Sequence, residues 1–167
     1  MIHSCNHWRN EVKVGPYKVL ASSYHAISGK RLKVESSLVP TLGIYLDEGW
    51  NNVDTGYPKL IVDRPDCGII ALPDLRSLEQ TIKNNLLAGE TLGIACYLGH
   101  GRTGTLLACL IADIENLAPD LAIKKLRHRY CSYVVEYEEQ VELVYSFCGK
   151  ASDRQDIGPK GSLDIRL

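Results

Sequence analysis

Length, composition and charge exclude several classes of protein. The chain has 167 residues, 45% apolar and 23% charged, which fits one folded domain with a hydrophobic core and excludes wholesale disorder. Its 19 Lys and Arg against 20 Asp and Glu give a net charge of −1, which disfavours a dedicated nucleic-acid or membrane-surface binder. Because no apolar run reaches the ~18 residues of a transmembrane helix and the N-terminus lacks a signal-peptide pattern, we expect a cytoplasmic protein without nucleic-acid or membrane partners.

Apolar runs bounded by glycine and proline predict strands in the first half of the chain. Three such runs cover residues 17–21, 42–46 and 59–63, and a fourth, at 92–96, leads into a glycine-rich segment. The spacing of Leu75, Leu78, Ile82 and Leu86 predicts a helix that is capped by Asp74 and ends at Gly89.

Three more helices are expected at about 103–117, 119–129 and 137–148, the second of them opened by Pro119. Residues 151–167 are polar and glycine-containing, which predicts a loose tail. Strands interleaved with helices indicate a layered α/β or α+β domain.

The cysteines indicate reduced thiols. Six of them are scattered through the chain without a C-x-x-C pair, which disfavours a disulfide framework or a zinc site. His3, Cys5 and His7 could ligate a metal, but an unstructured terminus is the better interpretation. We therefore expect no metal and no cofactor.

Residues 95–104, of sequence ACYLGHGRTG, carry the pattern that indicates chemistry. Cys96 ends a predicted strand, and Arg102 and Thr103 stand at the start of a helix. A tight turn into a helix points successive backbone N–H groups inward and forms a cradle for a tetrahedral anion. The helix N-terminus and Arg102 favour a thiolate at Cys96, and Arg102 can clamp two phosphate oxygens. Thr103 can donate a hydrogen bond to the sulfur.

This run resembles the signature loop of the cysteine-dependent phosphatases, the protein tyrosine and dual-specificity enzymes. The resemblance covers about residues 60–148 and implies a single-domain α/β fold over residues 1–150, with a mostly parallel central sheet flanked by helices. It implies that Cys96 is the nucleophile, and that Arg102 and Thr103 assist it. It also implies a phosphate cradle formed by Tyr97, Leu98, Gly99, His100, Gly101 and Arg102.

Two further segments are similar to motifs of that family. Residues 64–68, of sequence RPDCG, match the loop whose aspartate protonates the leaving group and then activates water, which implies this role for Asp66. Pro-Asp-x-Gly is also a favoured turn by itself, and Asp63 and Asp74 are rival candidates. Residues 135–140, of sequence VEYEEQ, match the segment whose glutamine positions the hydrolytic water, which implies this role for Gln140, although an exposed helical glutamine is an equal alternative.

The chain departs from the family pattern at two positions. Ala95 replaces the usual histidine before the nucleophile, and Arg64 replaces the tryptophan of the acid loop. We expect a monomeric phosphomonoester hydrolase that acts on phosphorylated proteins. The alternatives are a weakly catalytic phosphate-binding protein, a phosphatase for a phosphoinositide or an RNA 5′-phosphate, and, less favoured, a sulfur transferase. The absence of lysine from the loop disfavours a multiply phosphorylated lipid.

Overall fold

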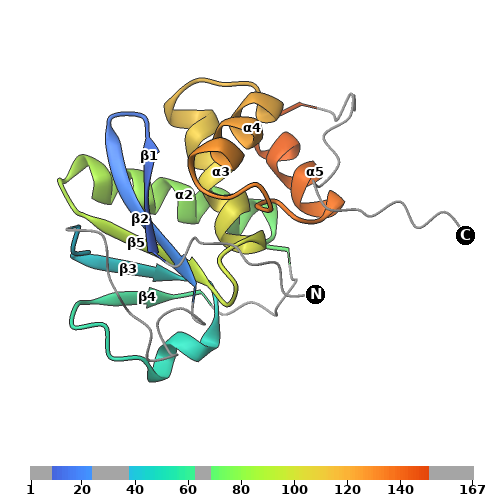
Figure 1. The fold of residues 1–167 in the computed structure, drawn as a ribbon. Coiled ribbons are helices and arrows are strands. Elements are labelled where there is room, and N and C mark those ends of the chain that lie inside the picture. The colour runs from blue at the N-terminus through green and yellow to red at the C-terminus, as the bar shows by residue number, and fades with distance from the viewer. Residues whose placement is uncertain (1–8, 24–37, 63–68, 151–167) are drawn as a thin grey trace, which may run out of the picture.

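A five-stranded sheet with the order β1-β2-β5-β3-β4 organises the chain (Figure 1). The computed structural model describes residues 9–23, 38–62 and 69–150. The strands are β1 (Arg9–Val14), β2 (Tyr17–Ser23), β3 (Leu42–Tyr45), β4 (Lys59–Ile61) and β5 (Leu92–Cys96). Among the strand pairs of the described residues, β1–β2 is antiparallel and the other three are parallel, which confirms the expected mostly parallel α/β fold.

The four expected helices are confirmed, with two corrected starts. They are α2 (Leu72–Leu87), α3 (Gly101–Ile114), α4 (Pro119–Arg129) and α5 (Glu138–Phe147), and a short 3₁₀ helix, η1 (Glu48–Asn52), follows β3. The cap predicted at Asp74 is wrong: α2 begins at Leu72, because Pro73 suits a first turn whose N–H groups lack partners. Helix α3 begins at Gly101, so Arg102 and Thr103 lie in its first turn.

Strand β1 was not predicted from the sequence. Val12 and Val14 are buried and alternate with polar residues, which is the period of a strand with one face on the core. This strand forms a hairpin with β2 through Gly15 and Pro16. The predicted tail at 151–167 lies outside the described residues. Within the described ranges, no helix is both long and apolar enough to cross a membrane.

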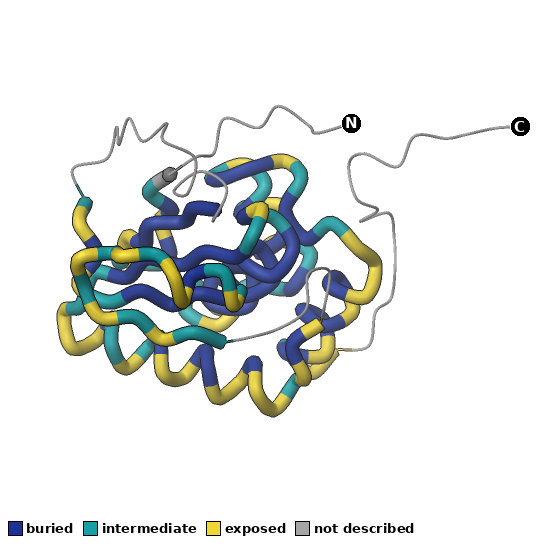
Figure 2. The backbone as a smooth tube through the Cα atoms, turned by 90° about the horizontal axis from the view of Figure 1, so that it is seen from below, coloured by how far each residue is buried: buried dark blue, intermediate teal, exposed yellow. Residues whose placement is uncertain are grey.

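The two faces of β5 pack against different groups of residues. Leu92, Ile94 and Cys96 join the main core, which also holds the buried faces of α2, α3, α4 and α5. Figure 2 shows the sheet as a buried layer, with the outer turns of the helices exposed. On the opposite face, Ala95 packs with Tyr45 and Trp50, whose rings stack with centroids 3.9 Å apart. Central position and burial on both faces make β5 the rigid base of the segment that follows it.

Glu115, at the end of α3, connects three parts of the fold. Its carboxylate accepts hydrogen bonds from the Gly15 backbone N–H, Lys125 Nζ and Arg129 Nη1, which ties the β1–β2 turn to α4. Burial alone would raise the pKa of Glu115, but the bonds from Arg129, Lys125 and Gly15 outweigh it and lower the pKa to about 2.

We expect Glu115→Gln to lower the free energy of unfolding at neutral pH. Because the pKa of the folded state lies below the ordinary 4.5, the carboxylate stabilises the protein above that pH, and the contribution is lost as the pH falls through about 2. Allowing for solvent screening, the cost is ~1–2 kcal/mol. Urea unfolding at several pH values measures it, and a gap between wild type and variant that stayed constant down to about pH 2 would contradict this assignment.

Candidate active site

The turn from β5 into α3 places Cys96 at the carboxyl end of the central strand. Parallel neighbours β2 and β3 flank this end, the position at which α/β sheets bind ligands. The Gly99 backbone N–H donates to Cys96 Sγ at 3.2 Å. Gly99 has a φ of +79°, and a Cβ there would lie 2.8 Å from Ser22 O, so this turn requires glycine. The sulfur is thus held by a backbone donor within the expected cradle.

Arg102 is buried beside the turn and is fixed by the residues that follow β3. Its side chain is 2% exposed; Nη1 donates to Leu46 O at 2.5 Å, and Nη2 donates to Asp47 Oδ2 at 3.0 Å. The other oxygen of Asp47, Oδ1, accepts from Gly49 N–H and caps η1. One carboxylate therefore orients the guanidinium and starts the neighbouring helix.

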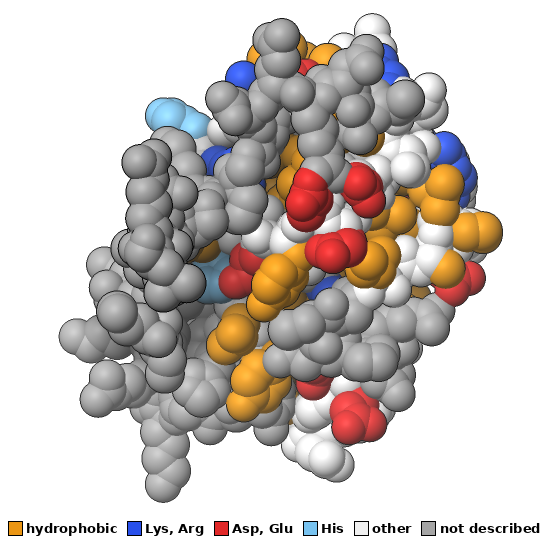
Figure 3. Space-filling view, turned by 90° about the vertical axis from the view of Figure 1, so that its right-hand side faces the viewer, with side chains coloured by type: hydrophobic (Ala, Val, Ile, Leu, Met, Phe, Trp, Pro, Cys, Tyr) orange, Lys and Arg blue, Asp and Glu red, His pale blue; other side chains and the backbone are white. Residues whose placement is uncertain are grey.

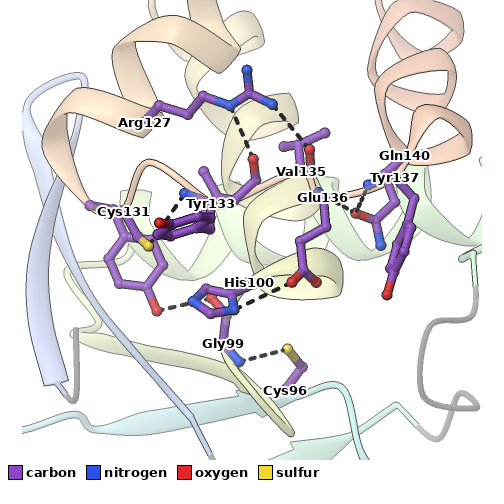
Figure 4. Close-up of polar contacts among 12 residues, drawn as sticks. Cys96, Gly99, His100, Arg127, Cys131, Tyr133, Val135, Glu136, Tyr137 and Gln140 are labelled. Atoms are coloured by element: carbon purple, nitrogen blue, oxygen red, sulfur yellow. Dashed lines mark hydrogen bonds and ion pairs between the residues drawn. The ribbon is translucent and has the colours of Figure 1, made fainter. Parts of the chain in front are cut away.

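Gln140 lies against the turn at Gly101. It is 2% exposed, and its Oε1 accepts from the backbone N–H groups of Glu136 at 2.9 Å and Tyr137 at 3.4 Å. These bonds fix which end of the amide is oxygen, so the Nε2 donor faces the turn (Figure 4). A Cβ on Gly101 would lie only 2.5 Å from this Nε2. Gln140 is therefore a buried wall of the site rather than an exposed helical residue.

These residues enclose a cavity of about 50 Å³. Its lining consists of Cys96, Leu98, Gly101, Arg102, Glu136, Tyr137 and Gln140. A larger hollow of about 540 Å³ lies among α2, α3 and α5, where Cys148 is the lining thiol. Burial raises the pKa of Cys148, which disfavours its thiolate. The smaller cavity is the better candidate because it combines a thiol, a guanidinium and a buried amide.

His100 lies in the turn beside the carboxylate of Glu136. Its Nδ1 is 3.5 Å from Glu136 Oε1 (Figure 4). Burial alone would lower the pKa of His100, but Cys131 and Glu136 together raise it to about 9. An imidazolium is thus the main form at neutral pH, within the turn that follows Cys96.

The structure brings together three of the predicted catalytic residues, Cys96, Arg102 and Gln140, along one cavity. Thr103 is fully buried, and its Oγ1 has no hydrogen-bond partner among the described residues, so the expected bond to Cys96 is not formed. Asp66 and its rival Asp63 lie outside the described residues, and so does Arg64. Asp74 lies in the first turn of α2 and does not line the cavity.

Two residues of the site were missed in the sequence. Asp47 directly follows the strand predicted at residues 42–46. Its position at a strand end was the signal in the sequence that could have marked it as a residue of the site. Glu136 lies within the quoted VEYEEQ segment but was assigned no role. No group of three or more His, Cys, Asp or Glu suited to a metal ion occurs in the parts of the chain that the structure describes.

Comparison with solved structures assigns the fold. The structure of Tk-PTP in its active form matches with a TM-score of 0.58 at 21% identity, over 65% of this chain and 78% of that one. PTPMT1 in complex with PI(5)P matches with a TM-score of 0.62 at 18% identity, over 84% and 94% of the two chains. The human tyrosine phosphatase-like serine/threonine/tyrosine-interacting protein matches with a TM-score of 0.65 at 14% identity, over 83% and 95%. The chain has the protein tyrosine phosphatase fold.

Sequence comparison adds relatives without an assigned activity. The uncharacterized proteins MJECL20 and MJ0215 of Methanocaldococcus jannaschii are each 36% identical to this chain, over 95 and 92 residues, or 56% and 54% of it. The matched regions span 61% and 55% of those two proteins. No protein-family model matches the chain. The phosphatase fold therefore rests on structural likeness and on the geometry of the Cys96 loop.

We expect His100→Asn to remove a pH-dependent part of the stability of this phosphatase fold. Because the pKa of folded His100 is raised above 6.5, its contribution is complete below that pH and is lost as the pH rises through about 9. Urea unfolding from about pH 6 to pH 10 should show wild type ~1–2 kcal/mol more stable at the acidic end and equal to the variant at the alkaline end. A gap independent of pH would contradict the assignment.

Proposed function

We propose that this protein is a phosphomonoester hydrolase that acts through a phosphocysteine at Cys96. The observation that carries the proposal is the convergence of Cys96, Arg102 and Gln140 on one cavity at the carboxyl end of β5. The phosphatase fold supports it, because in this arrangement the backbone N–H groups of the turn and the start of α3 favour a bound dianion.

The first step of the proposed reaction transfers the phosphoryl group to sulfur. Cys96 Sγ attacks phosphorus in line, the bond from phosphorus to the leaving oxygen breaks, and Asp66 gives its proton to that oxygen. Arg102 stabilises the equatorial oxygens of the transition state, because its guanidinium is already oriented by Leu46 and Asp47. In the second step, water attacks the phosphocysteine, with Gln140 positioning it.

We propose phosphorylated protein, and phosphotyrosine in particular, as the substrate. Leu98 and Tyr137 are 44% and 45% exposed and line the cavity, so they can contact the ring of a phenyl phosphate. Among the described lining residues, Arg102 is the only Lys or Arg, and Glu136 adds a negative charge to the same lining. This balance of charge disfavours a ligand with several phosphates. Figure 3 shows acidic and apolar side chains side by side on the face toward which α5 lies.

Cys96→Ser should abolish hydrolysis of p-nitrophenyl phosphate while the melting temperature stays near that of wild type, because a serine hydroxyl does not ionise in this cradle. Cys148→Ser, at the half-buried thiol outside the cavity, is the matched control and should keep full activity. Both assays are run with chelator present. Turnover by Cys96→Ser would exclude a phosphocysteine, whereas oxyanion binding by an inactive wild type would support the binding-only alternative.

Asp66→Ala should slow turnover by roughly 100- to 10,000-fold for substrates with poor leaving groups. The loss should be smaller for p-nitrophenyl phosphate, because nitrophenolate leaves without a proton. Comparison of kcat for phosphoserine peptide, phosphotyrosine peptide and nitrophenyl phosphate measures this dependence. If Asp63→Ala showed it instead and Asp66→Ala behaved as wild type, the acid would be Asp63.

A further inference from the structure

Hydrolysis of a phosphocysteine requires a group that takes a proton from the attacking water. Among the described residues that line the Cys96 cavity, Glu136 is the only Asp or Glu. Its side chain is 31% exposed, so it is partly screened from bulk water and still accessible from the cavity. A carboxylate in this position is a candidate base by chemistry and by location.

The carboxylate of Glu136 lies beside the amide of Gln140. A Cβ built on Gly101 would be 2.5 Å from Gln140 Nε2 and 3.2 Å from Glu136 Oε2, so both atoms border the same point above the turn. The cavity of about 50 Å³ has room for a water molecule. One water there can accept a hydrogen bond from Gln140 Nε2 and donate one to Glu136 Oε2. Its second lone pair then points away from both side chains.

The backbone around Glu136 is held in an unusual conformation. Val135 has a φ of +56°, which is rare and costly for a β-branched residue. Arg127 maintains this turn, since its Nε donates to Val134 O and its Nη2 to Val135 O, both at 3.2 Å. The turn presents Glu136 toward the Cys96 loop, and the backbone N–H of Glu136 at the same time orients Gln140 (Figure 4).

The two carboxylate oxygens of Glu136 have different neighbours, because His100 lies beside one of them. Its Nδ1 lies 3.5 Å from Oε1, whereas Oε2 is the oxygen that faces Gly101. The imidazolium also balances the negative charge that Glu136 brings toward a bound phosphate, since the pKa of His100 is about 9. The repulsion between the Glu136 carboxylate and a bound phosphate is therefore partly cancelled by the His100 imidazolium.

We propose that Glu136 is the general base of the second step, in place of Asp66, and that Gln140 holds the water for it. This assignment rests on the proposed phosphocysteine mechanism. The water oxygen bonds to phosphorus as the phosphorus–sulfur bond breaks. The electron pair of the broken bond stays on Cys96 Sγ, which leaves as a thiolate. One proton of the water passes to Glu136 Oε2, and the products are hydrogen phosphate and the protonated carboxyl group. Solvent then accepts that proton.

Rapid-quench kinetics of Glu136→Gln with p-nitrophenyl phosphate tests the assignment. We expect a burst of nitrophenolate close to one equivalent per enzyme, followed by turnover slowed roughly 100- to 10,000-fold. Intact-mass measurement of the quenched protein should show one added phosphoryl group, mapped to Cys96. Glu136→Asp should recover part of the steady-state rate, because it restores a carboxylate at a slightly greater distance.

Three comparison variants give the test its specificity. Glu139→Gln changes an exposed carboxylate of the same segment that does not line the cavity, and it should accumulate no phosphoenzyme. Asp66→Ala should accumulate no phosphoenzyme, and its burst with p-nitrophenyl phosphate should slow only modestly because nitrophenolate leaves without a proton. His100→Gln removes the partner of Glu136 but leaves the base, so it should not trap the phosphoenzyme.

The outcomes separate this assignment from the proposed function. Wild-type turnover by Glu136→Gln, or slow turnover without phosphoenzyme, would overturn the role of Glu136 while leaving the phosphocysteine mechanism intact. Equal trapping in His100→Gln would show that Glu136 acts only by holding the loop. A wild-type chain that releases no nitrophenolate would overturn the proposed function itself.

Discussion

The buried guanidinium of Arg102 joins the two elements between which the Cys96 cavity opens. Removing a charge from water costs several kcal/mol unless it is paired and hydrogen-bonded. Leu46 O and the carboxylate of Asp47 meet this requirement, so the start of α3 is fixed relative to the end of β3. The other end of the turn is Cys96, the last residue of the central strand. Both ends of the loop are therefore held before any anion binds, which is the condition for a preorganised cradle.

Packing supports the end of β5, which carries Cys96, from the other face of the sheet. The phosphatases that the Cys96 loop resembles carry a histidine before their cysteine, where this chain has Ala95. Ala95 is fully buried and packs with the stacked rings of Tyr45 and Trp50. The stack extends toward Tyr57, whose hydroxyl is 2.6 Å from that of Tyr45. The end of β5 is thus supported by aromatic contacts, a type of support that does not depend on a side-chain hydrogen bond at position 95.

The segment between α4 and α5, together with the start of α5, supplies Glu136, Tyr137 and Gln140 to the lining of the cavity. Arg127, on α4, holds the carbonyl groups of Val134 and Val135, and the N–H groups that follow hold Gln140 at the start of α5. Tyr130 completes the connection, since its hydroxyl donates to Gly99 O within the turn. The strained backbone at Val135 persists because these contacts determine the segment from both sides.

Local patterns in the sequence determined most of the elements and the Cys96 loop. The helices follow from apolar residues at a period of 3.6, β5 from a short apolar run, and the turn into α3 from Cys96, Arg102 and the glycines between them. Strand β1 was missed because its two valines form too short an alternation to stand out from a polar terminus.

Only the tertiary structure decided which distant residues contact the Cys96 loop and its cavity. Asp47 and Glu136 lie about 50 and 40 residues from Cys96 in sequence, on either side of it, and each carries an ordinary surface residue type. Their roles arise from the strand order, which places the end of β3 beside that of β5, and from the packing of α4 and α5 against α3. Sequence spacing records contacts within a turn or along one helix face, whereas contacts between distant segments depend on how the layers pack.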